Sequence, residues 1–399
     1  MRVHCQLGEG ATLVRCGLGG LASLGLALAA NATALSPQAQ LGRQIFFDPT
    51  LSASGQLSCA SCHDPTNAYA APKTSGVVMM GGANGDRPGL RAVPSLRYLS
   101  DTPRFARHSY IDVGREREDV GPAGGLMLDG RADNLREQVL LPLLDPAEMA
   151  NSDVGEVAAK LGRASYAAEL LRTGASGAAA QPLIEAAAAA LERFELEDPS
   201  FHPYTSRFDE YLRGAGALSA DELDGLRLFV DPAKGNCTAC HTATTGPGGS
   251  APTFTDHSYH ALGVPRNPAI QANTDPRFFD LGMCGPRRED LRGETQYCGY
   301  FKTPTLRNVT RRRFFFHNGR FTTLRDVMSF YVERDTDPGR WYPTVAGKLR
   351  KFDDLPARYR DNVNTSDAPM NRGPSDAPAL SAAEIEKVVA FLGSLSDAN

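Results

Sequence analysis

The chain has 399 residues, of which 42% are hydrophobic and 22% are charged, a composition typical of a globular protein that excludes a disordered one. Its formal net charge of -4 at pH 7 shows no basic excess, which excludes nucleic acid as the expected partner. The length is enough for two ordinary domains.

The N-terminus has the pattern of a secretory signal peptide. Arg2 and Arg15 supply positive charge, the apolar run GLGGLASLGLALAA follows, and the tripeptide ANA at 30–32 fits a cleavage site. We therefore expect residues 1–32 to be a signal peptide. The apolar run is shorter than the roughly 18 residues of a transmembrane helix, so an uncleaved anchor is the less favoured alternative and no membrane association is expected after cleavage.

Two segments of the chain repeat one pattern. Residues 41–63 read LGRQIFFDPTLSASGQLSCASCH, and residues 224–241 read DGLRLFVDPAKGNCTACH. A glycine, a phenylalanine and an Asp-Pro pair align at one constant offset, which indicates an internal repeat. Each copy is predicted to form a helix, a turn and a Cys-x-x-Cys-His motif.

Helices are predicted around and between these copies. Ser219 with Glu222, and Ser381 with Glu384, have the spacing of capping boxes at helix starts. The alanine-rich residues 153–197 have a helical pattern and connect the copies, while strand signals are weak throughout. We therefore predict a mainly α fold with two cytochrome c-like haem domains and extensive loops, at 33–200 (including the helical connection) and 201–399.

Each Cys-x-x-Cys-His motif offers two thiols for thioether bonds to haem vinyl groups, followed by a histidine for the iron. A zinc site would need further cysteine or histidine ligands at partner spacings, which are not evident. The sequence therefore predicts two covalently bound c-type haems, and this chemistry together with export indicates the periplasm. The predicted haem-binding residues are Cys59, Cys62 and His63 at the first site, and Cys237, Cys240 and His241 at the second.

Two of the eight cysteines are left over after the signal region and the haem motifs are counted. Cys284 and Cys298 are the expected disulfide in an oxidising compartment. Two unpaired thiols are the alternative.

The sixth iron ligands decide the function, because a six-coordinate haem transfers electrons whereas an open haem can bind peroxide. No histidine occurs between Asp64 and Arg107. Met79 and Met80 are alternative ligands in a glycine-flanked loop, but we expect the first haem to be open. Splitting peroxide then needs a group that moves a proton.

Candidates for this group lie in residues 126–149, which contain Gln138 and Glu148. From periodicity alone, Glu148 would be an ordinary surface charge. However, the pattern DGRA-x-x-L-x-x-Q followed by P-x-x-x-P-x-E-M resembles the bacterial di-haem cytochrome c peroxidase and MauG family, as do PTLRNV at 304–309 and FHNG at 316–319. The resemblance implies that Glu148 is the acid/base and that Gln138 assists it on the peroxide side of the first haem.

The resemblance also implies that the sixth ligand of the second haem lies on the helix after FHNG, where it is methionine in the peroxidases and tyrosine in MauG. Counting from His317 places Tyr331 at this position. Tyr331 shares a helical face with Met328, which is the competing ligand. A phenolate is a hard anionic donor that favours oxidised iron, so the second haem should store oxidising equivalents well.

Two departures from the family pattern concern the region between the haems. Many members have a tryptophan just before DGRA, where this chain has Leu128, and Trp341 is the candidate substitute relay; a core tryptophan is the alternative. The family's calcium site would use the backbone carbonyls of Arg312 and Phe314, but its asparagine is replaced by Ala92. A calcium ion therefore stays an open alternative.

The segments ERDTDPGRWYP and CGP…CGYFKTP resemble a narrower MauG-like subgroup that includes MbnH. This resemblance implies that hydrogen peroxide generates a high-valent di-haem state, which oxidises a tryptophan of a copper-binding partner protein to kynurenine. Two alternatives remain. One is a cytochrome c peroxidase supplied with electrons by a small redox protein, and the other is an electron-transfer cytochrome, against which Gln138 and Glu148 argue.

Overall fold

The computed structural model describes residues 34–113, 116–173, 180–245 and 249–398. The predicted signal peptide and its cleavage site lie outside these residues. Residues Leu35–Asn399 form one compact unit. No helix in the described part of the chain is long and apolar enough to cross a membrane.

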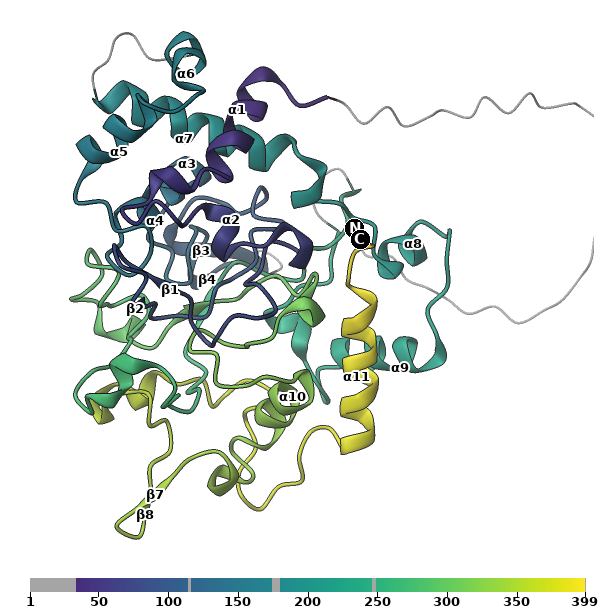
Figure 1. Cartoon of the computed structure of the whole chain (residues 1–399). Helices are drawn as coiled ribbons and strands as arrows, with labels where there is room; N and C mark the ends of the chain where they lie inside the picture. The colour runs from purple at the N-terminus through teal and green to yellow at the C-terminus, as the bar shows by residue number, and fades with distance from the viewer. Residues whose placement is uncertain (1–33, 114–115, 174–179, 246–248, 399) are drawn as a thin grey trace, which may run out of the picture. The chain divides into compact units, whose positions relative to one another are not determined.

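The unit is mainly helical with extensive loops, which confirms the predicted fold class (Figure 1). Both predicted capping boxes are present, with Ser219 and Ser381 each accepting a hydrogen bond from the backbone N–H of the glutamate three residues later. The α-helices are α1 (Pro37–Phe46), α2 (Cys59–Cys62), α3 (Leu135–Gln138), α4 (Leu140–Leu144), α5 (Val154–Leu161), α6 (Ala167–Thr173), α7 (Ala180–Glu197), α8 (Arg207–Leu212), α9 (Ala220–Val230), α10 (Leu324–Glu333) and α11 (Ala382–Ser394).

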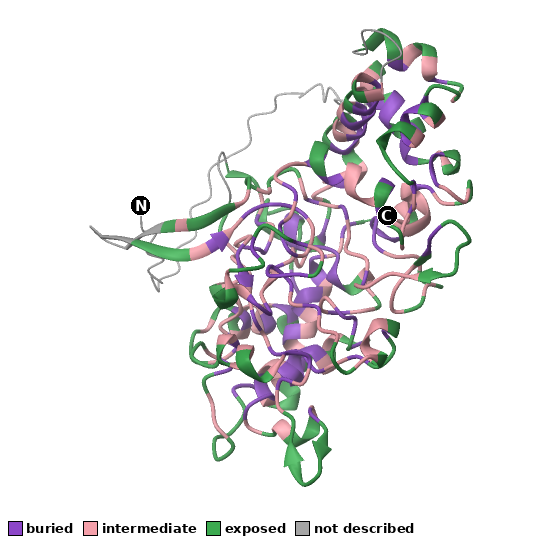
Figure 2. Ribbon diagram, turned by 90° about the vertical axis from the view of Figure 1, so that its left-hand side faces the viewer, coloured by how far each residue is buried: buried purple, intermediate pink, exposed green. Residues whose placement is uncertain are grey.

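All strands in the described residues pair as two-stranded antiparallel ribbons. Three ribbons have strands of two residues, whereas β3 and β4 have eight residues each. The β3–β4 pair projects from the unit, and most of its residues whose burial is described are exposed (Figure 2). The ribbons are β1 (Met80–Gly81) with β2 (Arg87–Pro88), β3 (Ala106–Val113) with β4 (Glu116–Ala123), β5 (Tyr259–His260) with β6 (Phe301–Lys302), and β7 (Thr344–Val345) with β8 (Lys348–Leu349).

The internal repeat has a packing reason. Helix α1 packs on α7, and α9 packs on α11 (Figure 1). A Cβ atom on Gly42 would lie 1.9 Å from the carbonyl oxygen of Ala190, and one on Gly225 would lie 2.0 Å from that of Lys387. The glycine of each copy therefore lets its helix approach a partner helix more closely than any other residue would allow.

The two largest hydrophobic cores of the described residues follow from these helix pairs. One core draws on buried residues from Leu41 to Phe201, and the other on buried residues from Phe208 to Leu395. The division into domains at residue 200 stays a prediction, which these separate cores support. Cys284 and Cys298 are buried and joined by a disulfide bond, with their Cα atoms 5.0 Å apart.

Gly225→Ala should destabilise the protein by about 1–3 kcal/mol, because the added methyl group forces α9 away from α11. Gly393→Ala, on α11, is the matched control: a Cβ there meets no atom within 4 Å, so the better helix propensity of alanine should leave stability unchanged or raise it by up to about 1 kcal/mol. Thermal unfolding of the haem-loaded variants measures both effects. Equal melting temperatures for the two variants would contradict the close-packing explanation.

Candidate functional site

The first Cys-x-x-Cys-His motif borders a cavity. Cys59 and Cys62 begin and end α2, and both line this cavity together with His63. The Nδ1 atom of His63 lies 3.1 Å from the carbonyl oxygen of Tyr69. Because a carbonyl only accepts hydrogen bonds, Nδ1 carries the proton and Nε2 is left for a metal. Burial lowers the pKa of His63 to about 4, so the imidazole is neutral, which is the form that binds iron.

The second motif repeats this arrangement at a second cavity, which Cys237, Cys240 and His241 line. The Nδ1 atom of His241 lies 2.9 Å from the carbonyl oxygen of Phe254, and burial lowers the pKa of this histidine too. Two thiols and one oriented, neutral imidazole at each cavity fit two covalently attached haems.

The zinc alternative finds little support. Within the described residues, the one group of three side chains close enough together to hold a metal ion is Cys240, Asp256 and His260. The first motif therefore gathers no zinc ligands. At the second motif, Asp256 accepts a hydrogen bond of 2.6 Å from the hydroxyl of Ser258, and attachment of a haem would use the Cys240 thiol.

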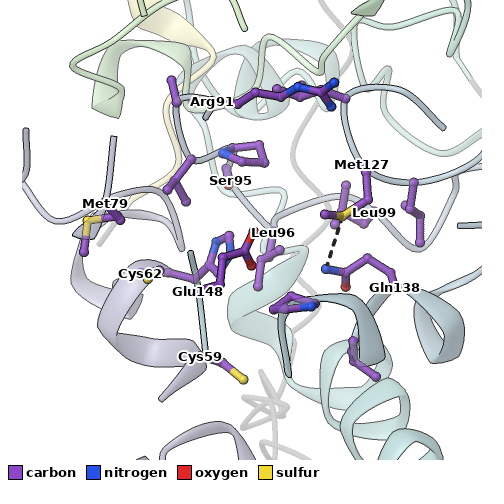
Figure 3. A pocket seen from close by; sticks show the side chains of 18 of the residues that line it. Cys59, Cys62, Met79, Arg91, Ser95, Leu96, Leu99, Met127, Gln138 and Glu148 are labelled. Carbon is purple, nitrogen blue, oxygen red and sulfur yellow. Dashed lines mark hydrogen bonds between the residues drawn. The ribbon is translucent and has the colours of Figure 1, made fainter. Parts of the chain in front are cut away.

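Glu148 and Gln138 both line the first cavity. Glu148 reaches into the middle of this pocket, whereas Met79 lies at its edge (Figure 3). Gln138 ends α3, and its Nε2 donates to the sulfur of Met127 over 3.7 Å. Burial and, secondarily, the nearby Asp145 carboxylate raise the pKa of Glu148 to about 7. A carboxyl group with this pKa can both accept and return a proton near neutral pH.

Both candidate ligands for the second iron line the second cavity. Tyr331 and Met328 lie one turn apart on α10, whose first turn is capped by the side chain of Thr323. Burial raises the pKa of Tyr331, so its phenol ionises only where a cation offsets this cost. Met370 lines the same cavity and was not predicted, but its sulfur lies 3.4 Å from Nη1 of Arg334, which donates to it.

The two cavities share one wall, and Leu128 is part of it. Trp341 lines neither cavity; it packs edge-on against Phe330, with ring centroids 5.6 Å apart, and Arg340 lies over its ring. Its role as a relay between the haems stays a prediction. The residues that line both cavities are Leu128, Lys302, Thr303, Pro304 and Arg312.

The residues of the predicted calcium site do not all line the same cavity. Ala92 lines the first cavity, and its backbone N–H donates to the carbonyl oxygen of His317. Arg312 lines both cavities, but Phe314 lines neither. Calcium at this place stays an open prediction.

Several ionisable side chains at the cavities were missed from the sequence, among them those of Lys302, Glu195 and Arg312, the last of which was named only for its backbone carbonyl. Burial lowers the pKa of Lys302 to about 7 and that of Arg312 to about 10. Burial also raises the pKa of Glu195 to about 8, and the Oε2 of this residue has no hydrogen-bond partner. Glu195 could have been found, because it lies four residues after Leu191 on an apolar helix face. Lys302 lies in the two-residue strand β6 and Arg312 follows a short turn, so neither position carries such a periodic signal.

Comparison with known proteins identifies the family. Residues 36–217 match the family model described as di-haem cytochrome c peroxidase. The methylamine utilization protein MauG of Paracoccus denitrificans is 33% identical over 300 residues, which cover 73% of this chain and 73% of that protein. The chain belongs to the di-haem cytochrome c peroxidase/MauG family. It is thus a haem-dependent oxidoreductase, and the di-haem family implies two c-type haems.

Other members of the di-haem family are similar over most of the chain. The cytochrome c551 peroxidase of Nitrosomonas europaea is 29% identical over 301 residues, covering 73% of this chain and 71% of that protein. The diheme peroxidase BthA of Burkholderia thailandensis has a TM-score of 0.81 and 40% identity, covering 91% of this chain and 87% of BthA. A MauG-like protein associated with microbial copper homeostasis shares the fold, with a TM-score of 0.62, 23% identity, and coverage of 91% of this chain and 90% of that one.

Glu148→Gln should slow the reaction of the diferric di-haem protein with hydrogen peroxide by about 100-fold or more, because an amide cannot accept the peroxide proton. Since the pKa of Glu148 is raised to about 7, the wild-type rate should be highest above pH 7 and fall as the pH drops below it. Stopped-flow spectroscopy measures the rates. Glu289→Gln, at an exposed side chain, is the control that keeps the wild-type rate and pH profile. A pH step that persists in Glu148→Gln would assign it to another group.

Proposed function

We propose that this protein is a periplasmic enzyme that uses hydrogen peroxide to oxidise a residue of a partner protein. The expected target is a tryptophan of a copper-binding protein, converted to kynurenine by two successive peroxide turnovers, with the indole C2 carbon released as formate by hydrolysis. The observation that carries the proposal is a tyrosine, Tyr331, lining the second cavity on α10. The predicted signal peptide and the disulfide between Cys284 and Cys298 support the location.

Glu148 performs the proton transfer at the first cavity in this proposal. As a carboxylate it accepts the proton from one peroxide oxygen, and as a carboxylic acid it returns this proton to the other oxygen, which leaves as water. Gln138 is buried beside this cavity and orients the peroxide. The haems, when bound, supply the redox chemistry that reduces peroxide and stores the two oxidising equivalents.

Tyr331 explains why the oxidising equivalents are stored rather than passed on at once. A phenolate ligand stabilises oxidised iron more than a methionine thioether does. A second haem with this ligand is a poor acceptor for electrons from a small cytochrome. It suits the slow oxidation of a difficult donor, such as an aromatic side chain of another protein.

The choice of partner rests on one similarity over most of the chain and on one resemblance in two short segments. The chain is 33% identical to MauG of Paracoccus denitrificans. The segments ERDTDPGRWYP and CGP…CGYFKTP resemble the MbnH subgroup, which suggests the copper-binding partner. Trp341 belongs to the first of these two segments and is partly exposed. Its ring packs against that of Phe330 on α10. Its proposed part in electron transfer is a relay.

A cytochrome c peroxidase is the second candidate, because the c551 peroxidase of Nitrosomonas europaea is 29% identical. The two functions differ in where the oxidising equivalents go. A peroxidase turns over rapidly with reduced cytochrome c, whereas the proposed enzyme modifies a protein residue stoichiometrically with peroxide.

The proposal is tested by incubating the diferric protein with hydrogen peroxide and an exported copper-binding protein from a neighbouring gene. Mass spectrometry of the partner should find a tryptophan converted to kynurenine, and reactions without peroxide or with Glu148→Gln should lack it. An unmodified partner together with rapid oxidation of reduced cytochrome c would favour the peroxidase instead.

Tyr331→Met should change the absorption spectrum of the second haem, raise its reduction potential and shorten the life of the oxidised state formed with peroxide, because a thioether favours ferrous iron. Met328→Leu is the control from the same cavity and should leave the spectrum unchanged. Spectroscopy of both diferric variants decides between the ligands. If only Met328→Leu alters the second haem, the sixth ligand is Met328.

A further inference from the structure

Six arginine and lysine residues line the first cavity, and four of them are neutralised by the protein itself. Arg91 pairs with both Asp129 and Asp280 at 2.7 Å, and Arg131 pairs with Asp129 at 2.8 Å. The other two of these four cations are Arg287, which pairs with Asp145, and Arg307, which pairs with Asp209.

The remaining two cations have no carboxylate partner among the described residues. Lys302 donates from Nζ to the carbonyl oxygen of Gly125. The guanidinium of Arg312 makes no hydrogen bond or ion pair within the described chain, and its buried Nε finds no acceptor. These are also the two cations that line both cavities, and the second cavity has no other arginine or lysine among its described lining residues.

A buried cation without a counter-charge is strongly unfavourable, so such groups are normally paired. Each of the other four cations of the first cavity forms a salt bridge with an aspartate. The lack of a carboxylate partner at the shared wall therefore indicates that a bound group supplies the negative charge there. A haem carries two carboxylate side chains. These are the anions that cavities fitted for haem would receive.

We propose that Arg312 and Lys302 form a shared cationic pair that binds carboxylate side chains of both haems and places positive charge between them. The backbone carbonyl of Arg312 is one of those at which the resemblance to the family suggested calcium. Ala92 contributes no side-chain oxygen there, and a guanidinium next to the two cavities makes a divalent cation unnecessary. The inference rests on the two haem sites and is independent of the substrate that the enzyme oxidises.

The test compares Arg312→Gln with Arg312→Lys in the haem-loaded protein. Loss of a positive charge close to a haem disfavours its reduction. Arg312→Gln should therefore lower the equilibrium constant for one-electron reduction of each haem about tenfold, which lowers each reduction potential by about 59 mV. Arg312→Lys should keep both potentials close to those of the wild type. Spectroelectrochemical titration measures them without any substrate.

Arg320→Gln is the matched control, because Arg320 is exposed and lines neither cavity. It removes the same charge and should leave both potentials unchanged. Addition of calcium, or of a chelator, should not alter the wild-type potentials. If Arg312→Gln does not load with haem, normal loading of Arg312→Lys supports the requirement for charge.

Three results would overturn the proposal: unchanged potentials in Arg312→Gln, a shift in one haem alone, or a chelator effect on the wild type as large as the substitution. Failure of both Arg312 variants to load with haem would also overturn it, since it would indicate a structural role. None of these results depends on whether a partner protein is oxidised, so this inference and the proposed function can fail separately.

Discussion

The wall between the two cavities is the feature on which the rest of the structure depends. Leu128, from the N-terminal part of the chain, and Lys302 to Pro304, from the C-terminal part, border both cavities. The backbone N–H of Lys302 donates to the carbonyl oxygen of Leu128 over 2.9 Å, so the two halves are tied together at this wall. The same residues therefore line both cavities and are joined to one another across the halves of the chain.

Each half then places its Cys-x-x-Cys-His motif at its cavity in the same way. A glycine on the helix before the haem motif allows close packing on a later helix, and a backbone carbonyl fixes the ring of the histidine. The close helix contact fixes the motif on one side, and the carbonyl fixes the imidazole on the other. What distinguishes the sites is their remaining lining, with Glu148 and Gln138 at the first cavity and Tyr331 at the second.

Much of this was predictable from the sequence, because the determining features are local. The two motifs, the capping boxes at Ser219 and Ser381, and the helical face of Tyr331 each follow from residues a few positions apart. The β3–β4 ribbon was missed because its exposed, charged strands show no alternation of apolar and polar residues. Lys302 and Arg312 were missed because their meaning depends on which carboxylates are absent nearby, and only the tertiary structure shows that.

The position of the unpaired cations also bears on how the two haem sites differ. Lys302 and Arg312 border both cavities, so their charge acts on both sites in the same direction. Tyr331 borders only the second cavity, where a phenolate would act in the opposite direction, towards oxidised iron. On these proposals the cations of the shared wall act equally on both haems, and Tyr331 adds a difference between them at the second cavity. An enzyme that receives peroxide at one haem and stores oxidising equivalents at the other requires this inequality.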